Sequence, residues 1–402
     1  MSHINKKRLP STRMNDFSFV SVVDYLQQIQ GENVGAGFGV NQFLCGNTVS
    51  GTGYLGGVYS PTQNRIYLCP YSQSNVAIWH YIDCNTGSVV AYTHGFGTTI
   101  ITGAYYGGVY SPTQNRIYFT PYSISLAAQW HYLDCNTGAV IAYTHGFGTS
   151  TPGLAYIGGT YSPTQNRIYF SPYGISATAQ WHYVDCNTGA IVAYTHGAGI
   201  ATASSYYSGV YSPTQDRIYF APFAQSTSAN WHYVDCNTGA IVAYAHGATA
   251  AANAYAGGAY SPTQNRIYFA PRGQAPSAQW HYLDCNTGAV VAYTHGATAV
   301  ANAYAGAVYS PTQNRIFFVP INQSDSGVWH YLDCNTGVVV AYARKVTVLV
   351  SAYVGGVYSP TQNRVYFVPY QQSNQTYWHY IQEFSNSKVS PSLMASAMFN
   401  KL

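Results

Sequence analysis

Short runs of alternating apolar and polar residues fill most of the chain, and the runs repeat. The stretch Tyr110–Phe119 reads YSPTQNRIYF, and close copies of it begin at Tyr59, Tyr161, Tyr211, Tyr260, Tyr309 and Tyr358. Successive copies start 51, 51, 50, 49, 49 and 49 residues apart. A fixed period in this range indicates a repeat architecture.

One unit, Gly107–Gly148, can be divided into four predicted strands. GGVYS is a short β-type run, and PTQN is a turn in which proline fixes φ and asparagine tolerates left-handed geometry. RIYFTPY alternates and ends at a proline, QWHYLD forms a third run, and CNTG closes it tightly. AVIAYTHG is rich in β-branched and aromatic residues, as strands are. Each unit is therefore predicted to be a four-stranded antiparallel meander.

The predicted strands carry large apolar groups on both faces. Tyr118 points to one side of its sheet, and Ile117 and Phe119 point to the other. Such a sheet must be covered on both sides, which stacked neighbours achieve, and a closed ring leaves no terminal unit uncovered. The pattern predicts an all-β fold, a seven-bladed β-propeller of four-stranded antiparallel blades.

The repeated phrase SPTQNRIYF…WHYLDCNTGAVIAYTHG also resembles the YVTN-type and related WD-like propeller unit, over about residues 54–384. It departs from that family in having Gln-Asn where Asp-Gly is usual, and Trp-His-Tyr in the third strand. The phrase is similar as well to repeat units in structural proteins of bacteriophages and large DNA viruses. The first resemblance implies a propeller, and the second implies a virion component.

The last unit lacks the DCNTG turn, so a terminal strand is expected to close the ring. We expect Phe17–Val23 to supply the outer strand of the seventh blade, with Val389–Met394 as the alternative. Residues 1–33 then form a basic arm with the closure strand, and residues 34–384 form the propeller, with repeats starting near 54, 105, 156, 206, 255, 304 and 353. Residues 385–402 form a C-terminal tail.

The two ends of each meander differ in how much they vary. The first and third connections, SPTQNR and DCNTG, are nearly identical throughout, and they meet on what we call the constant face. The second and fourth connections differ between units and meet on the opposite, variable face. Loops on a rigid scaffold commonly carry recognition, so the variable face is the candidate binding surface, with neutral drift after duplication as the alternative.

A tyrosine begins the innermost strand of every unit, and the seven should ring the channel mouth on the variable face: Tyr54, Tyr105, Tyr156, Tyr206, Tyr255, Tyr304 and Tyr353. Tyrosine gives contact area at low entropic cost, together with a hydroxyl, which suits binding. The alternative is that these rings wedge between blades.

Other recurring residues have structural interpretations. Arg65 and Asp83 should lie opposite each other as a cross-strand pair, repeated in the later units. The third-strand tryptophans mark the period: Trp79, Trp130, Trp181, Trp231, Trp280, Trp329 and Trp378. The family resemblance implies that His145 interacts with Trp130 inside a blade.

An active site needs one convergent constellation, whereas these histidines and carboxylates are periodic. No phosphate loop, nucleophile elbow or zinc spacing occurs in the sequence. We therefore expect no enzyme activity, no catalytic residues, no cofactor and no metal.

Composition narrows the class further. Only 7% of residues are charged and 41 are tyrosine, yet no apolar stretch is long enough to span a membrane. A net charge of +4 spread over the repeats does not suggest a nucleic-acid surface, and the cluster Lys6, Lys7, Arg8 suits a solvated or docking arm. Six of the eight cysteines occupy one repeated slot, too far apart for disulfides, so free thiols and a reducing cytosol are expected.

Together these observations predict a non-enzymatic structural and interaction protein, a virion component such as a tail, fibre or capsid-decoration subunit. Its partners would be other virion or assembly proteins, held by the N-terminal arm or the C-terminal tail, and a host-surface glycan or receptor on the variable face. The expected location is the virion, assembled in the host cytoplasm, with the cytoplasm as the alternative. A multivalent glycan-binding lectin is the second hypothesis, and a quinoprotein-like enzyme is the third.

Overall fold

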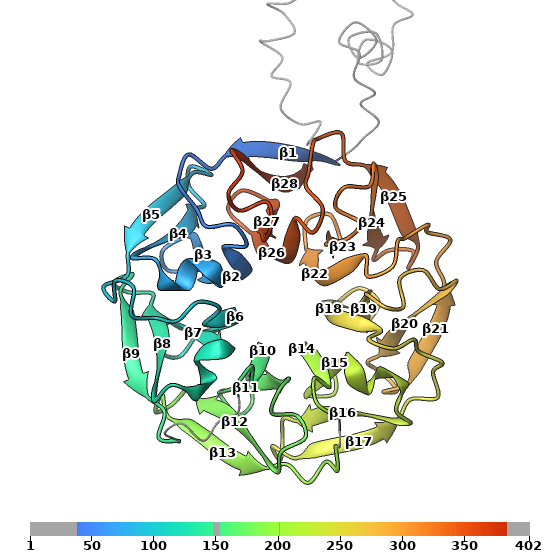
Figure 1. Cartoon of the computed structure of the whole chain (residues 1–402). Helices are drawn as coiled ribbons and strands as arrows, with labels where there is room; N and C mark the ends of the chain where they lie inside the picture. Colours follow the sequence, from blue (N-terminus) through green and yellow to red (C-terminus); the bar gives the residue numbers. More distant parts are fainter. Residues whose placement is uncertain (1–37, 148–152, 201, 384–402) are drawn as a thin grey trace, which may run out of the picture. The chain divides into compact units, whose positions relative to one another are not determined.

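A computed structural model describes residues 38–147, 153–200 and 202–383. Seven four-stranded antiparallel sheets stand side by side around a central channel, as the blades of a propeller (Figure 1). The blades make up one compact unit, Gly39–Gln382. The predicted fold class, blade number and strand order are confirmed.

Every blade runs outward from the channel, strand by strand. The innermost strands are β2 (Tyr54–Ser60), β6 (Tyr105–Ser111), β10 (Tyr156–Ser162), β14 (Tyr206–Ser212), β18 (Tyr255–Ser261), β22 (Tyr304–Ser310) and β26 (Tyr353–Ser359). The second strands are β3 (Arg65–Pro70), β7 (Arg116–Pro121), β11 (Arg167–Pro172), β15 (Arg217–Pro222), β19 (Arg266–Pro271), β23 (Arg315–Pro320) and β27 (Arg364–Pro369). The third strands are β4 (Ile78–Asp83), β8 (Gln129–Asp134), β12 (Gln180–Asp185), β16 (Asn230–Asp235), β20 (Gln279–Asp284), β24 (Val328–Asp333) and β28 (Tyr377–Glu383).

The outer strands complete the blades. They are β5 (Val89–Thr93), β9 (Val140–Thr144), β13 (Ile191–Thr195), β17 (Ile241–Ala245), β21 (Val290–Thr294), β25 (Val339–Ala343) and β1 (Phe38–Leu44). Short 3₁₀ turns follow three of the second strands: η1 (Ser72–Asn75), η2 (Ser123–Leu126) and η3 (Ala224–Thr227).

Aromatic rings fill the space between adjacent blades. Trp79 is fully buried, and its ring lies edge-on to two rings of the next blade, Tyr105 at 6.3 Å and Phe119 at 5.7 Å between centroids. Trp378 makes the corresponding contact with Tyr54 at 6.4 Å, which joins the last blade to the first. Edge-to-face pairs of this kind add about 0.5–1.5 kcal/mol each beyond their area burial. The apolar faces predicted from the sequence therefore meet between blades.

The ring closes through a strand from the N-terminal part of the chain, but not through the predicted one. The seventh sheet has the order β1-β28-β27-β26, so Phe38–Leu44 is its outer strand. Phe43 packs against Tyr366 at 5.3 Å and Tyr380 at 5.8 Å, the contacts that the outer-strand tyrosine makes in other blades. Phe17–Val23 and its alternative Val389–Met394 both lie outside the described residues, and the position assigned to them is filled by Phe38–Leu44.

A belt of side-chain hydrogen bonds links blades on the constant face. The turn residue Asn64 has a φ of 51°, which asparagine tolerates better than most residues. The Thr62 hydroxyl donates to Asn115 of the next blade at 2.7 Å, and Thr361 donates to Asn64 at 2.6 Å across the ring closure. The repeated PTQN turn thus ties each blade to a neighbour as well as joining two strands.

The innermost strands approach so closely that a side chain does not fit at some positions. A Cβ atom added to Gly56 would lie 2.9 Å from Cα of Gly107 in the next blade. We predict that Gly56→Ala lowers the free energy of unfolding by about 1–3 kcal/mol, the usual cost of overpacking. Gly327→Ala is the matched control, because an added Cβ meets no atom within 4 Å there. Denaturant titration of both variants is the measurement, and equal midpoints would contradict the close approach.

Candidate binding surface on the variable face

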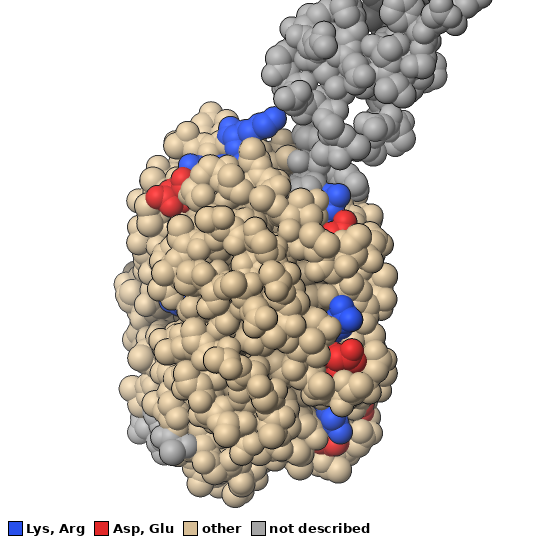
Figure 2. All heavy atoms as spheres, turned by 90° about the vertical axis from the view of Figure 1, so that its right-hand side faces the viewer, with Lys and Arg blue, Asp and Glu red and all other residues tan. Residues whose placement is uncertain are grey.

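The strand register puts the connections on the two faces predicted from the sequence. Ser111 pairs with Arg116 and Arg116 with Asp134, so the first and third connections of that blade lie at one end. Figure 2 views the disc from the side, with basic (blue) and acidic (red) residues next to each other at intervals along the face on the right. Most of the remaining surface in view is uncharged. The repeated Arg–Asp positions lie at this end of the blades, so the charged face is the constant face.

The Arg–Asp positions have structural tasks on that face. Arg65 lies opposite Asp83 in the register, and its guanidinium carbon is 4.3 Å from the centroid of the Tyr81 ring. The Asp83 carboxylate accepts hydrogen bonds from the backbone N–H groups of Asn85 at 2.8 Å and Thr86 at 3.3 Å, which holds the DCNTG turn. In the last blade, where Gln382 replaces the aspartate, Arg364 donates to its side chain at 3.0 Å.

The seven tyrosines predicted to ring the channel mouth are buried between adjacent blades instead. Each is fully buried, and each hydroxyl is hydrogen-bonded to Nδ1 of the third-strand histidine in its own blade, as Tyr54 is to His80 at 2.5 Å. The remaining pairs are Tyr105–His131, Tyr156–His182, Tyr206–His232, Tyr255–His281, Tyr304–His330 and Tyr353–His379. The expected position is thus corrected, and the burial fits the alternative that these rings pack between blades.

A β-bulge causes this difference. The register between the first two strands shifts directly after the tyrosine: Tyr54 pairs with Pro70 and Gly56 with Cys69, which leaves Leu55 without a partner. A bulge of this kind re-aims the side chains around it. The tyrosine turns away from the channel and the next residue turns toward it, whereas the sequence prediction placed the first residue of the strand at the channel.

The buried histidines are held neutral. Burial lowers the pKa of His80 to about 4 and has the same effect on His131. Burial also raises the pKa of Tyr54 well above its usual range. A neutral pair of this type stabilises a blade and is unsuited to acid–base catalysis near neutral pH.

The second set of histidines stacks on the repeated tryptophans. The rings of Trp130 and His145 lie 4.1 Å apart at 19°, and Nε2 of His145 is 2.6 Å from the Ala127 carbonyl oxygen. The resemblance implied an interaction between these two residues, and its form here is stacking. The Trp181 indole instead donates to the Ser176 carbonyl oxygen at 3.3 Å.

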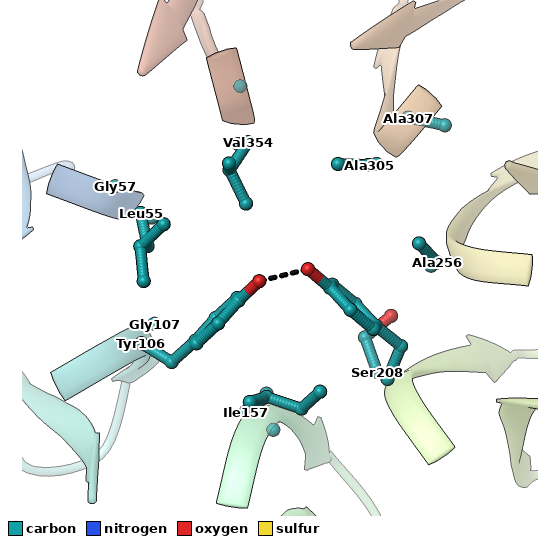
Figure 3. A pocket seen from close by; sticks show the side chains of 18 of the residues that line it. Leu55, Gly57, Tyr106, Gly107, Ile157, Ser208, Ala256, Ala305, Ala307 and Val354 are labelled. Carbon is teal, nitrogen blue, oxygen red and sulfur yellow. Dashed lines mark hydrogen bonds between the residues drawn. The ribbon is translucent and has the colours of Figure 1, made fainter. Parts of the chain in front are cut away.

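The residues that follow the seven tyrosines line the channel, and sequence reasoning missed them. They are Leu55, Tyr106, Ile157, Tyr207, Ala256, Ala305 and Val354, and they surround a cavity of about 210 Å³. In Figure 3 the Tyr106 hydroxyl meets a second phenol, that of Tyr207, across the channel. The sequence did contain a sign of these channel residues: the residue type at this position changes from unit to unit, whereas the tyrosine before it is the same in every unit.

A second ring of seven side chains surrounds the channel at the variable face, directly after the proline that ends each second strand. We call it the rim: Tyr71, Tyr122, Tyr173, Phe223, Arg272, Ile321 and Tyr370. All seven are half-buried. Neighbouring aromatic centroids of the rim are 6.3–6.4 Å apart, from Tyr370 through Tyr71 and Tyr122 to Tyr173 and Phe223.

Arg272 interrupts the aromatic rim with a positive charge. Its guanidinium carbon lies 5.3 Å from the Phe223 centroid and 5.6 Å from the Tyr207 centroid. Burial raises the pKa of Tyr207 above its usual value, and the positive charge of Arg272 opposes this rise. The side chain of Arg344, on the same face, donates instead to two backbone carbonyl oxygens, of Asp325 at 2.7 Å and Val346 at 2.9 Å.

All eight cysteines are buried free thiols, which confirms the prediction made for the six repeated ones and extends it to Cys45 and Cys69. Burial raises the pKa of Cys135 to about 11, so the thiol stays protonated. Within the described ranges, no group of three or more histidine, cysteine, aspartate or glutamate side chains is arranged to hold a metal ion. Nor does that part of the chain contain a helix long and apolar enough to cross a membrane.

Comparison with known protein families and with curated proteins finds no match. Solved structures do match. The extracellular domain of a putative hybrid two-component system from B. thetaiotaomicron aligns with a TM-score of 0.56 at 8% identity, over 85% of this chain and 40% of that one. This chain therefore spans well under half the length of that protein.

Two further structures align over most of both chains. U3-55K does so with a TM-score of 0.56 at 6% identity, over 86% of this chain and 98% of its own. A chain of the Mitotic Checkpoint Complex aligns with a TM-score of 0.56 at 10% identity, over 95% and 100%. These likenesses show the fold alone: a β-propeller of the kind that WD40 repeats form.

The neutral histidines predict acid sensitivity. The pKa is lowered to about 4 at His80, His131, His182, His281, His330 and His379, against 6.5 for an exposed histidine. Between pH 4 and pH 6.5 the unfolded chain binds more protons than the folded one. The contribution of the neutral histidines to the free energy of unfolding is therefore complete above pH 6.5 and is lost as the pH falls toward 4. We predict that the free energy of unfolding falls by several kcal/mol between pH 7 and pH 5.

Urea titrations at half-unit pH steps check this prediction. Carboxylates titrate near pH 4, so a loss already present between pH 6.5 and 5 belongs to the histidines. A flat stability over that window would contradict the neutral Tyr–His pairs.

Proposed function

We propose that the protein is a non-enzymatic interaction scaffold that binds a partner macromolecule with its variable face. The supporting observation is the division of one rigid disc into a repeated face and a face whose loops all differ. The repeated face uses its polar groups internally, in the Thr–Asn belt and the DCNTG turns. The varied loops are the part of the molecule that carries individual chemistry.

Those loops are held in place, as a binding surface requires. The Ser74 hydroxyl is 2.7 Å from the carbonyl oxygen of Ile101, so it joins the second connection of one blade to the fourth. The buried Gln73 side chain accepts from the Ser50 N–H at 2.8 Å and donates to the Ile78 carbonyl oxygen at 2.8 Å. Loops fixed in this way lose little entropy when a partner binds.

The finer form of the proposal is a virion component, a tail, fibre or capsid-decoration subunit, located in the particle after assembly in the host cytoplasm. Its support is the likeness of the repeat to units in structural proteins of bacteriophages and large DNA viruses. Mass spectrometry of purified particles tests this form, and particles without the polypeptide would exclude it.

The other two hypotheses gain no observation from the structure. Glycan binding was expected in pockets between blades lined by tyrosine and amide side chains, and the first-strand tyrosines such as Tyr255 are buried. A quinoprotein-like enzyme needs a charged cofactor pocket, whereas neither described section of the channel is lined by a charged side chain.

Site-specific cross-linking tests which face binds. Leu126 on the variable face and Val338 on the constant face are both exposed apolar side chains, at 49% and 55%. We predict that a photo-reactive phenylalanine at 126 cross-links a partner in the native assembly, because the partner covers that face. The same group at 338 is the matched control and should give few cross-links. Cross-linking at 338 but not at 126 would reverse the proposed orientation.

A further inference from the structure

Three residues that break the sevenfold repeat converge at one place in the disc. Tyr106, Tyr207 and Arg272 come from the second, fourth and fifth blades. The two phenols are hydrogen-bonded to each other, and the guanidinium carbon of Arg272 lies over the Tyr207 ring at 5.6 Å from its centroid. Under neutral variation, the side chains that differ between units would be scattered around the ring. Here those of three separate blades lie together, so this cluster is a candidate site.

We propose that the channel mouth on the variable face binds the carboxy-terminal residue of a partner polypeptide, with an aliphatic last side chain in the cavity and its terminal carboxylate on Arg272. The proposal rests on the proposed function, since it names the chemistry by which the variable face recognises a protein.

The positive charge at the rim favours an anionic ligand. Arg272 supplies the positive charge of the rim, and the other rim members are aromatic residues and one isoleucine. The charged side chains in the described connections of this face are Arg272, Arg344, Lys345 and Asp325, so its net charge is positive. A guanidinium stacked on aromatic rings keeps its planar fork in a fixed orientation, which suits a carboxylate.

The apolar lining of the cavity next to the rim favours an aliphatic side chain of the ligand. Figure 3 shows the phenol pair crossing the channel, with Leu55, Val354, Ala305 and Ala256 on one side and Ile157 on the other. The small side chains of Ala256 and Ala305 leave room on the first side. This section of the channel has a volume of about 210 Å³, below the roughly 300–1,000 Å³ typical of drug-sized ligands, so it holds a single side chain. Past Gly57 and Gly108 it continues into a wider section of about 470 Å³ toward the constant face.

The phenols supply hydrogen bonds to the same ligand. Burial raises the pKa of Tyr106 well above its usual range, and it raises that of Tyr207 too, so both hydroxyls keep their protons. Of two hydroxyls that share one hydrogen bond, one keeps a proton free for a further acceptor. A peptide carbonyl or carboxylate oxygen above the pair is such an acceptor.

A sugar acid, which also carries a carboxylate, fits this cavity less well. Each sugar hydroxyl that is buried without a hydrogen-bond partner costs about 1–3 kcal/mol. The side chains of the wall, Leu55, Val354, Ala305 and Ala256, cannot hydrogen-bond to these hydroxyls. A peptide end presents one carboxylate and one apolar side chain, which matches one arginine and one apolar wall.

Fluorescence anisotropy with the full chain tests the proposal. The probes are fluorescein-labelled peptides Gly-Ser-Gly-Ser-Leu with a free carboxylate, the same peptide ending in a carboxamide, and Gly-Ser-Gly-Ser-Gly with a free carboxylate. We expect the free acid ending in leucine to bind at least tenfold more tightly than either of the others. Arg272→Gln should remove the preference for acid over amide, and Ala305→Trp, which fills the cavity, should remove the preference for leucine over glycine.

Arg344→Gln is the matched control, because it removes an arginine of the same face whose donors already bind backbone oxygens, and it should leave both preferences unchanged. Equal binding of acid and amide, no binding of any peptide, or tighter binding of glucuronic acid than of the leucine peptide would each overturn the proposal. Cross-linking through position 126 would still succeed in these cases if the variable face binds a partner in another way, so the two proposals fail separately.

Discussion

The structure depends on one repeated contact, the packing of a third-strand tryptophan against the first- and second-strand aromatic rings of the next blade. Trp79 on Tyr105 and Phe119 is one instance, and Trp378 on Tyr54 closes the circle. No blade can make this contact alone, because the tryptophan and the rings that cover it belong to different units. The Thr–Asn belt on the constant face adds a second, polar connection along the same direction. The chain therefore gains its stability between units, and a unit is stable only as part of the ring.

The sequence alone was sufficient to predict the features that recur in every unit. Period, strand order, blade number, free thiols and the assignment of loops to two faces all follow from patterns that occur many times, so an accident in one copy cannot hide them. The closure strand was misplaced because it occurs once. Phe38–Leu44 has no repeated phrase, and its role as an outer strand follows only from its pairing with β28 and from the contacts of Phe43 with Tyr366 and Tyr380.

The tyrosines were misplaced for a different reason, a local irregularity of the strand. The bulge after Tyr54 leaves Leu55 without a partner, and a residue's place at the start of the innermost strand does not reveal that an extra residue follows it. The result is that seven identical tyrosines bind histidines in the core, while seven side chains of five different types line the channel. In this protein, identity between units marks structure, and difference between units marks the surface on which Tyr106, Tyr207 and Arg272 meet.

The central claim, that the blades are stable only as a closed ring, is tested most directly by removing the closing strand. A chain that begins at residue 38 keeps β1, and a chain that begins at residue 46 lacks it. We predict that the first unfolds in one cooperative transition, and that the second is less stable by about 3–5 kcal/mol, because it loses the buried Val40 and the partly buried Phe43 together. Identical unfolding curves for the two chains would contradict the account.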